Sequence, residues 1–216
     1  MFIVKNENMI LPSKEFWEVF KRTPGALSCT EAIAIMNIAA QVPESSYLEL
    51  GTYRGKSAMS ALVSLKNGSF DLVDPEFSDQ LQVSDEVMKM ASGGNIAINI
   101  IKAYSTDIIE NYNHLSYVFV DSGSHQDGLP MKEVILLENR VASGGIVAFH
   151  DFKNQFREPA EAAEYLVNTG KYEWVDIQWD SIIHYVKENN LEEGNDSWHI
   201  YEDRPFPNFV GAIKRK

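Results

Sequence analysis

Five short apolar runs alternate with segments of helical periodicity between residues 46 and 151. Strands that are apolar along their whole length are typically buried on both faces, and intervening helices allow successive strands to run parallel. Right-handed crossovers then place helices on both sides of the sheet. The sequence therefore predicts a single-domain α/β fold with a doubly wound, mostly parallel sheet. The predicted strands are SYLEL (46–50), SFDLVDP (69–75), NIAINIIKAY (95–104), SYVFVD (116–121) and GGIVAFHD (144–151).

Two helices are expected before the first of these strands. SKEFWEVFKR places three aromatic residues at helical spacing behind Ser13, and CTEAIAIMNIAAQV repeats the pattern behind Thr30, so that both residues are candidate N-caps. We divide the chain into an N-terminal helical segment, residues 1–46, and a core, residues 47–216. The N-terminal segment is expected to pack on the core and is a candidate cover for a substrate site. Further helices are predicted within SAMSALVSL (57–65), SDQLQVSDEVMKMA (78–91), GLPMKEVILLENRVA (128–142) and REPAEAAEYLVNTG (157–170).

The C-terminal part departs from this alternation. YEWVDIQWD (172–180) and NFVGAIKR (208–215) read as strands with no helix between them, and we expect them to pair antiparallel. SIIHYVKE (181–188) is also apolar enough for a strand, and it is an alternative hairpin partner for 172–180. The polar segment 189–207 is longer than an ordinary hairpin loop, so we expect an excursion over the surface.

Composition restricts the classes of partner. The chain of 216 residues has 19 Lys and Arg against 31 Asp and Glu, a net charge of −12 that disfavours binding to a phosphate backbone. No stretch approaches the roughly 18 apolar residues of a membrane helix. The first 16 residues lack the unbroken apolar stretch of a signal peptide, and Cys29 is the only cysteine. We therefore expect a cytoplasmic protein that binds neither nucleic acid nor membrane, and a homo-oligomer remains open.

The carboxyl ends of the predicted strands carry the residues of greatest functional interest, because ligands of open parallel sheets bind beyond these ends, where the strand order reverses. The spacing E-x-G-x-x-x-G at Glu49, Gly51 and Gly55 differs from the dinucleotide fingerprint G-x-G-x-x-G, which disfavours a nicotinamide enzyme. A carboxylate at Glu49 would repel a pyrophosphate but tolerate an ammonium or a sulfonium. Asp74, 25 residues further on, stands where an acid can accept hydrogen bonds from a ribose diol.

These motifs resemble those of the class I S-adenosylmethionine-dependent methyltransferases, from about Tyr47 to the C-terminus. LELGTYRGKSA is similar to the first motif of that family and LVDP to the second, while the closing strands resemble the hairpin of its seven-stranded sheet. YVFVDSGSH followed by VASGGIVAFHD is similar to a group of small-molecule O-methyltransferases with the pattern D-G-D-H, L-x-P-G-G and H-D. Ser143 stands in place of the proline of that pattern.

The resemblance implies a role for each matching position. Gly51 and Gly55 would bracket the methionine part of S-adenosylmethionine, Glu49 would face its amino group or orient the loop, Asp74 would hold the ribose, and Ser105 would lie beside the adenine. The complete set of expected cofactor-binding residues is Glu49, Gly51, Thr52, Gly55, Ser57, Asp74, Ser105 and Asp121.

The resemblance also implies a divalent cation, Mg²⁺ or Mn²⁺. Asp121 and Asp151 match the acidic ligands of metal-dependent relatives, with His150 or His125 nearby, and oxygen ligands suit these cations better than zinc. The cation would acidify a substrate hydroxyl, and His125 or His150 would take the proton. The expected catalytic residues are therefore His125, His150 and Asp151, and the expected metal ligands are Asp121, His150 and Asp151.

This chain departs from the family pattern at D-S-G-S-H. If His125 is aligned without a gap, Ser122 and Ser124 replace two acids, whereas keeping Asp121 in register requires an insertion of one residue before the histidine. Either alignment removes a possible metal ligand. We therefore keep two functions: methyl transfer from S-adenosylmethionine to a sugar or phenolic hydroxyl of a small molecule, and a catalytically inactive cofactor-binding or scaffold protein with the same fold.

Overall fold

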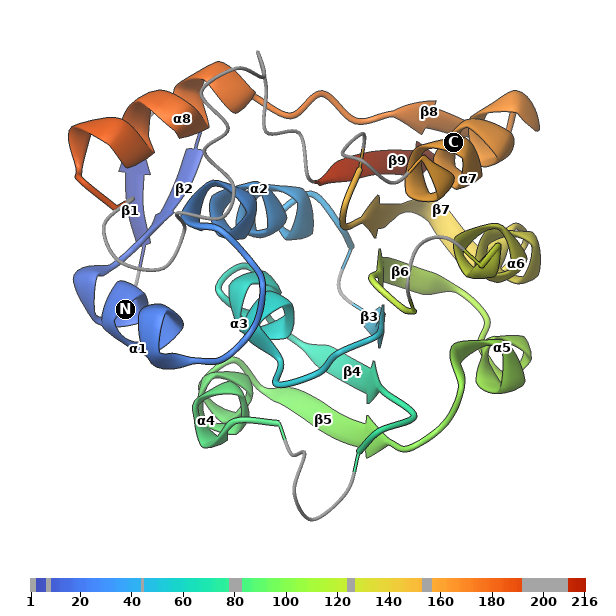
Figure 1. The fold of residues 1–216 in the computed structure, drawn as a ribbon, viewed down its shortest axis with the longest axis horizontal. Coiled ribbons are helices and arrows are strands. Elements are labelled where there is room, and N and C mark those ends of the chain that lie inside the picture. The colour runs from blue at the N-terminus through green and yellow to red at the C-terminus, as the bar shows by residue number, and fades with distance from the viewer. Residues whose placement is uncertain are drawn as a thin grey trace.

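The structure, a computed structural model, describes residues 3–6, 9–43, 45–77, 83–123, 127–152, 157–191 and 210–216. Seven of its strands form one sheet in the order β5-β4-β3-β6-β7-β9-β8 (Figure 1). The strands from β5 to β7 run parallel, and β9 is antiparallel to both β7 and β8. This confirms the predicted doubly wound, seven-stranded sheet with antiparallel C-terminal strands. The strands are β3 Ser45–Leu50, β4 Gly68–Val73, β5 Ile96–Ile101, β6 Leu115–Val120, β7 Val141–Phe149, β8 Tyr172–Trp174 and β9 Gly211–Arg215.

Helices cover both faces of the sheet and divide the core into two hydrophobic clusters (Figure 1). Helices α1 to α4 and α8 contribute to the cluster on one face, and α5 to α7 contribute to the other. The bounds are α1 Lys14–Arg22, α2 Cys29–Ala39, α3 Lys56–Leu62, α4 Asp85–Gly93, α5 Ser105–Ile108, a 3₁₀ turn at Ile109–Asn111, α6 Leu129–Leu137, α7 Glu158–Asn168 and α8 Trp179–Glu188. None of the helices in the described ranges is long and apolar enough to cross a membrane.

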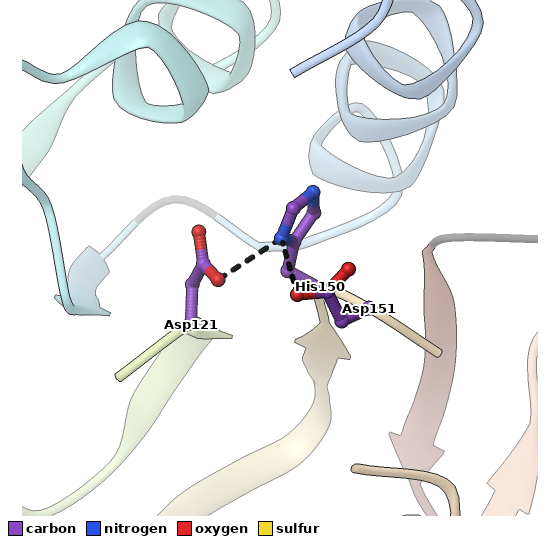
Figure 2. A group of neighbouring side chains, drawn as sticks. All are labelled: Asp121, His150 and Asp151. Carbon is purple, nitrogen blue, oxygen red and sulfur yellow. Dashed lines mark hydrogen bonds and ion pairs between the residues drawn. The ribbon is translucent and has the colours of Figure 1, made fainter. Parts of the chain in front are cut away.

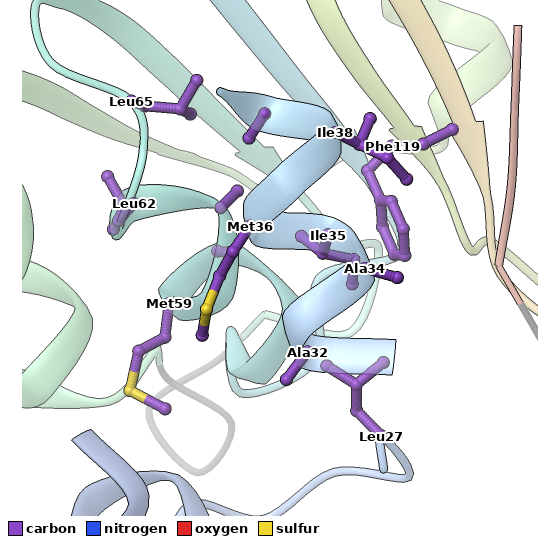
Figure 3. Packing of buried hydrophobic residues seen from close by; sticks show 14 of the residues in the cluster. Leu27, Ala32, Ala34, Ile35, Met36, Ile38, Met59, Leu62, Leu65 and Phe119 are labelled. Atoms are coloured by element: carbon purple, nitrogen blue, oxygen red, sulfur yellow. The ribbon is translucent and has the colours of Figure 1, made fainter. Parts of the chain in front are cut away.

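Helix α2 is buried on nearly all sides. It contacts α3, α8 and strands β2 and β7, and nine of its eleven residues are buried. Figure 3 shows its side chains packing between Met59 and Leu62 of α3 and Phe119 of the sheet. A helix that is apolar all round belongs to a core rather than to a surface layer. The division of the chain at residue 46 stays a prediction, but α2 shares one hydrophobic cluster with the core that follows it.

Two expectations for the N-terminal segment need correction. A short antiparallel pair, β1 (Ile3–Asn6) with β2 (Met9–Pro12), precedes the two helices. Ser13 is the N-cap of α1 as predicted, whereas the N-cap of α2 is Ser28 rather than Thr30. Ser28 and Glu31 form a reciprocal capping box, in which each side chain bonds the backbone N–H of the other residue. This box starts the helix two residues earlier than expected.

The prediction that no helix separates the two C-terminal strands was wrong. Residues 179–188 form α8, so the strand alternative for 181–188 is also wrong, and β8 is limited to three residues. The apolar residues of this segment follow helical spacing, and Ile182 and Val186 are buried in the cluster that contains α2. The predicted excursion at 189–207 lies mostly outside the described residues.

Candidate cofactor and metal site

The strand order reverses at the centre of the sheet. Strand β3 pairs with β4 on one side and with β6 on the other, so the chain winds outward in both directions from β3 and β6. Ligands of doubly wound sheets bind at the carboxyl ends of such strands. Glu49, Asp74, Asp121 and His150 all lie at this edge of the sheet, in or just after β3, β4, β6 and β7.

Gly51 joins the ends of three strands. Its N–H donates to the carbonyl of Val73, and its φ of +85° lies in the left-handed region. A Cβ at this position would stand 2.2 Å from the carbonyl oxygen of Asp121 and 2.8 Å from Cα of Ser122. Only glycine fits so close an approach of two backbones, so the packing of β3 against the loop after β6 is sufficient to require it.

Gly55 is the N-cap of α3, also with a left-handed φ of +82°. A Cβ here would meet the methyl groups of Val87 and Val83 at 3.0 and 3.2 Å. The contacts of Gly55 are therefore with α4 and the residues before it. The expected contacts of both glycines with the methionine part of a cofactor stay predictions.

Glu49 is a fully buried carboxyl group at the end of β3. Ser57 Oγ donates to its Oε1 at 2.7 Å, whereas its Oε2 has no hydrogen-bond partner within the described part of the chain. Burial raises the pKa of Glu49 to about 8, since the bond from Ser57 only partly offsets the loss of water and the nearby Asp121 adds repulsion. The glutamate is thus largely a neutral acid near pH 7, with one oxygen available to a donor.

Asp74 fastens the glycine loop to the end of β4. Its Oδ2 accepts a hydrogen bond from the N–H of Tyr53 at 2.9 Å, and its Oδ1 accepts one from the N–H of Glu76 at 2.8 Å. The side chain is buried and does not turn into bulk water. Each carboxylate oxygen keeps a further lone pair, and the predicted contact with a ribose diol stays a prediction.

The two remaining positions expected near the cofactor are also buried. Thr52 follows Gly51 in the loop, and its N–H donates to Val73. Ser105 is the first residue of α5, directly after the exposed Tyr104. The structure thus places Thr52 after β3 and Ser105 after β5, at the same edge of the sheet, and their contacts with a cofactor stay predictions.

Asp121, His150 and Asp151 form a compact group across the ends of β6 and β7. One ligand atom of each lies within 4.8 Å of the others. Nδ1 of His150 lies 3.0 Å from Oδ1 of Asp121 and 3.7 Å from Oδ2 of Asp151, and Figure 2 shows this nitrogen turned toward both carboxylates. The group therefore brings together the three residues that the sequence predicted as metal ligands. Two carboxylate oxygens and one imidazole nitrogen form a donor set that fits a divalent cation such as Mn²⁺.

Glu31, which the sequence analysis did not select, lies on the opposite side of the same imidazole. Its Oε1 is 3.2 Å from Nε2 of His150, and its Oε2 accepts the N–H of Ser28 at 2.7 Å in the capping box. The side chain is 2% exposed. The S-x-x-E spacing from Ser28 to Glu31 is a capping-box signature and could have identified the helix start, but nothing in the sequence links it to a residue 119 positions later, 150 − 31.

His150 is held as an imidazolium. Burial lowers its pKa, but the carboxylates of Asp121 and Glu31 outweigh this effect and keep the pKa well above its usual value. Both ring nitrogens face an acid, so the imidazolium offers no lone pair to a substrate proton, and it would have to lose the proton on Nδ1 to bind a cation. This pairing disfavours the predicted role of His150 as the proton acceptor. Asp151, with 21% of its side chain exposed, is better placed for it.

The departures from the family pattern lie in the loop after β6. Ser122 is buried and donates its hydroxyl hydrogen bond to Glu133 of α6, a fully buried acid. Ser122 is therefore engaged with the helix that covers this side of the sheet. Ser124 and His125, the alternative predicted base, lie outside the described residues.

Comparison with known proteins agrees with this architecture. Residues 48–152 match a protein-family model described as a methyltransferase domain. An O-methyltransferase from Bacillus cereus, solved in complex with SAH, aligns with a TM-score of 0.54 at 13% identity, covering 76% of this chain and 84% of that one. A candidate O-methyltransferase from Klebsiella pneumoniae gives 0.54 at 11% identity, covering 76% and 83%. A candidate rRNA methylase from Clostridium thermocellum gives 0.54 at 12% identity, covering 84% and 93%.

No curated protein matches the sequence. At these identities the structural matches establish the fold and not the substrate. The matched domain begins within β3 and ends just after β7, so it contains Glu49, Asp74, Asp121 and the His150–Asp151 pair. Residues 48–152 are thus similar to a methyltransferase domain, and the chain has the fold of the class I S-adenosylmethionine-dependent methyltransferases.

Proposed function

We propose that the protein transfers a methyl group from S-adenosylmethionine to an oxygen of a small molecule, such as a sugar or phenolic hydroxyl, with the help of a divalent cation. The observation that carries the proposal is the meeting of two groups at one edge of the sheet. Glu49 and Asp74 lie beside the glycine loop, and Asp121, His150 and Asp151 lie on the adjacent strand ends.

The first group suits the methyl donor. The unbonded Oε2 of Glu49 is a buried polar atom that would gain a partner in the ammonium group of S-adenosylmethionine, and the charge of that group would favour the ionised carboxylate. Asp74 fixes the loop around it and offers its remaining lone pairs to the ribose. When bound, S-adenosylmethionine supplies an electrophilic methyl group on a sulfonium.

The second group suits the acceptor. Asp121, His150 and Asp151 would hold Mg²⁺ or Mn²⁺, which lowers the pKa of a bound hydroxyl. Asp151 is partly exposed and lies at the carboxyl end of β7, where it can orient the hydroxyl and accept its proton. With a cation bound, Nδ1 of His150 would be a ligand and Nε2 would stay directed at Glu31. Most of the acceleration would come from alignment of the oxygen with the methyl group.

A small-molecule acceptor fits the charge of the chain better than a nucleic acid. One of the structural neighbours is a candidate rRNA methylase, so RNA has to be tested as an acceptor. The net charge of −12 works against association with a phosphate backbone at physiological salt. We therefore rank RNA below a small molecule as the methyl acceptor.

Calorimetry and a transfer assay together test the proposal. The protein should release heat on titration with S-adenosylmethionine and with its demethylated product, and Glu49→Ala should abolish this heat. Transfer of a labelled methyl group should then be assayed with pooled sugars and phenols, with total RNA in a separate arm, with and without Mn²⁺. Absence of any heat with either compound would contradict the proposal, and labelling of RNA alone would replace the acceptor class.

The alternative of a catalytically inactive cofactor-binding protein is favoured by one observation. Ser122, which replaces an acid of the family pattern under one alignment, is engaged with Glu133 in the interior. This alternative holds if the protein binds S-adenosylmethionine but transfers no label to any acceptor in the assay. Asp151→Asn should then give the same calorimetry and transfer results as wild type.

A further inference from the structure

The buried acid of α2 reaches the strand ends of the candidate site. Glu31 lies in the first turn of α2, near the start of the chain, whereas His150 follows β7. Both side chains are almost fully buried, at 2% and 9% exposure, and their facing atoms are 3.2 Å apart. A pair withdrawn from water to this extent carries a large desolvation cost, which only close pairing can offset. The position of each side chain is therefore determined by the other.

The contact between Nε2 and Glu31 lacks the geometry of a hydrogen bond but lies within ion-pair distance, and it favours one orientation of the imidazole. Nε2 faces Glu31, so Nδ1 is directed at Asp121 and Asp151. Rotation of the ring by half a turn would remove Nε2 from its buried acid. Figure 2 shows the resulting arrangement, with Nε2 on the far side of the ring from both aspartates.

We infer that Glu31 is a positioning residue of the metal site: it holds the Nε2 side of His150 so that Nδ1 is presented to a cation between Asp121 and Asp151. This inference rests on the cation of the proposed function. Ligating histidines generally pair their second ring nitrogen with a carboxylate or carbonyl, which fixes both the ring and its tautomer. In this chain the carboxylate comes from outside the matched methyltransferase domain, because Glu31 precedes residue 48.

The carboxylate of Glu31 also caps helix α2, and this second interaction determines which of its oxygens faces His150. Its Oε2 is bound to the N–H of Ser28, which leaves Oε1 for the imidazole. A glutamine would keep one carbonyl oxygen for Ser28 and turn its NH₂ group toward Nε2. Two donors would then face each other unless the ring kept its proton on Nδ1, where it would block a cation.

The inference is tested by Mn²⁺ binding, followed by electron paramagnetic resonance, and by nitrogen-15 spectra of the histidines. Glu31→Gln should weaken Mn²⁺ binding about 10- to 100-fold. Ser28→Ala is the matched control, since it removes the hydroxyl of the same capping box but keeps the backbone N–H that binds Glu31. This variant should bind Mn²⁺ as wild type does. Circular dichroism establishes that both variants are folded.

The wild-type spectrum tests the inference even if Glu31→Gln fails to fold. Wild type should show a slowly exchanging proton on Nε2 of His150, and Glu31→Gln should lose it. A wild-type spectrum without this proton, or Mn²⁺ affinity equal in wild type and Glu31→Gln, would overturn the inference. If wild type shows the proton but binds no Mn²⁺, the cation of the proposed function is wrong and Glu31 orients His150 for the protein alone. Calorimetry with S-adenosylmethionine separates both results from failure of cofactor binding.

Discussion

A Cβ on Gly51 would lie 2.2 Å from the carbonyl oxygen of Asp121, so the loop after β3 and the loop after β6 meet backbone to backbone. This contact joins the two halves of the candidate site. One half carries Glu49 and the glycine loop, and the other carries Asp121. Because no side chain separates the loops, a change at Gly51 must displace one of them.

We predict that Gly51→Ala lowers the free energy of unfolding by about 2 to 5 kcal/mol, through left-handed strain together with overpacking. Urea denaturation measures this loss. Gly170→Ala is the matched control: its φ of +77° is similar, but no heavy atom of the described residues lies within 4 Å of the added Cβ. It should lose only about 1 to 2 kcal/mol from strain. Equal losses in the two variants would mean that Gly51 is not tightly packed.

The buried carboxyl of Glu49 should make stability depend on pH. Its folded pKa of about 8 lies above its usual value of 4.5, so the folded state binds the extra proton between these values. The contribution of Glu49 is therefore favourable at low pH, and it is lost as pH rises from about 5 to 8. The loss is at most about 1.4 kcal/mol for each pH unit between the two pKa values.

We predict that Glu49→Gln flattens this dependence. The variant cannot ionise, so its free energy of unfolding should fall less than that of wild type between pH 5.5 and 8.5. Chemical denaturation at several pH values gives the two slopes, and Glu164→Gln, on the exposed side of α7, serves as the control. A wild-type slope unchanged in Glu49→Gln would show that Glu49 is ionised in the folded protein.

The sheet could be predicted because its signal is local. Each parallel strand is a short apolar run, and the residues at strand ends share an edge in any parallel sheet. Asp121, His150 and Asp151 were placed together on this basis, and the structure brings them within reach of one cation. The prediction for the C-terminal segment was wrong because residues 181–188 are short and apolar, and such a segment fits a strand or a buried helix equally well.

The role of Glu31 could not be predicted, because it depends on how α2 packs against the sheet. The sequence shows a glutamate with capping-box spacing, which is common at helix starts and does not imply a second partner. The same limit applies to the glycines. The spacing of the two glycines suggested a ligand. The structure shows that a Cβ at Gly51 would also meet the backbone of Asp121, and that one at Gly55 would meet the side chain of Val87.

Asp74 should affect both stability and cofactor binding. Asp74→Asn can accept only one of the two N–H groups, from Tyr53 and Glu76, that Asp74 now accepts. We predict a loss of about 1 to 2 kcal/mol in stability. The affinity for S-adenosylmethionine should fall about tenfold or more, from a loss of about 1.4 kcal/mol or more in binding, measured by calorimetry.

Asp71 on the same strand provides the comparison for this variant. Its two oxygens accept hydrogen bonds from Asn99 and Tyr112, so Asp71→Asn should cost a similar amount of stability. It should leave the affinity for S-adenosylmethionine unchanged, because Asp71 lies within β4 and not at its carboxyl end. A similar loss of affinity in both variants would attribute the effect of Asp74 to general destabilisation.

The pairing of His150 with two acids should be the most costly single interaction to remove at the site. His150→Ala leaves Glu31 buried without the imidazolium that faces it. Breaking a buried ion pair by removing one partner costs about 3 to 5 kcal/mol. Urea denaturation at pH 7.5 measures this loss of stability. His184→Ala is the control: it also removes a histidine paired with a glutamate, Glu188, but on the exposed surface of α8, where such pairs contribute little. A loss in His150→Ala as small as in His184→Ala would show that Glu31 and His150 do not stabilise each other as a buried ion pair.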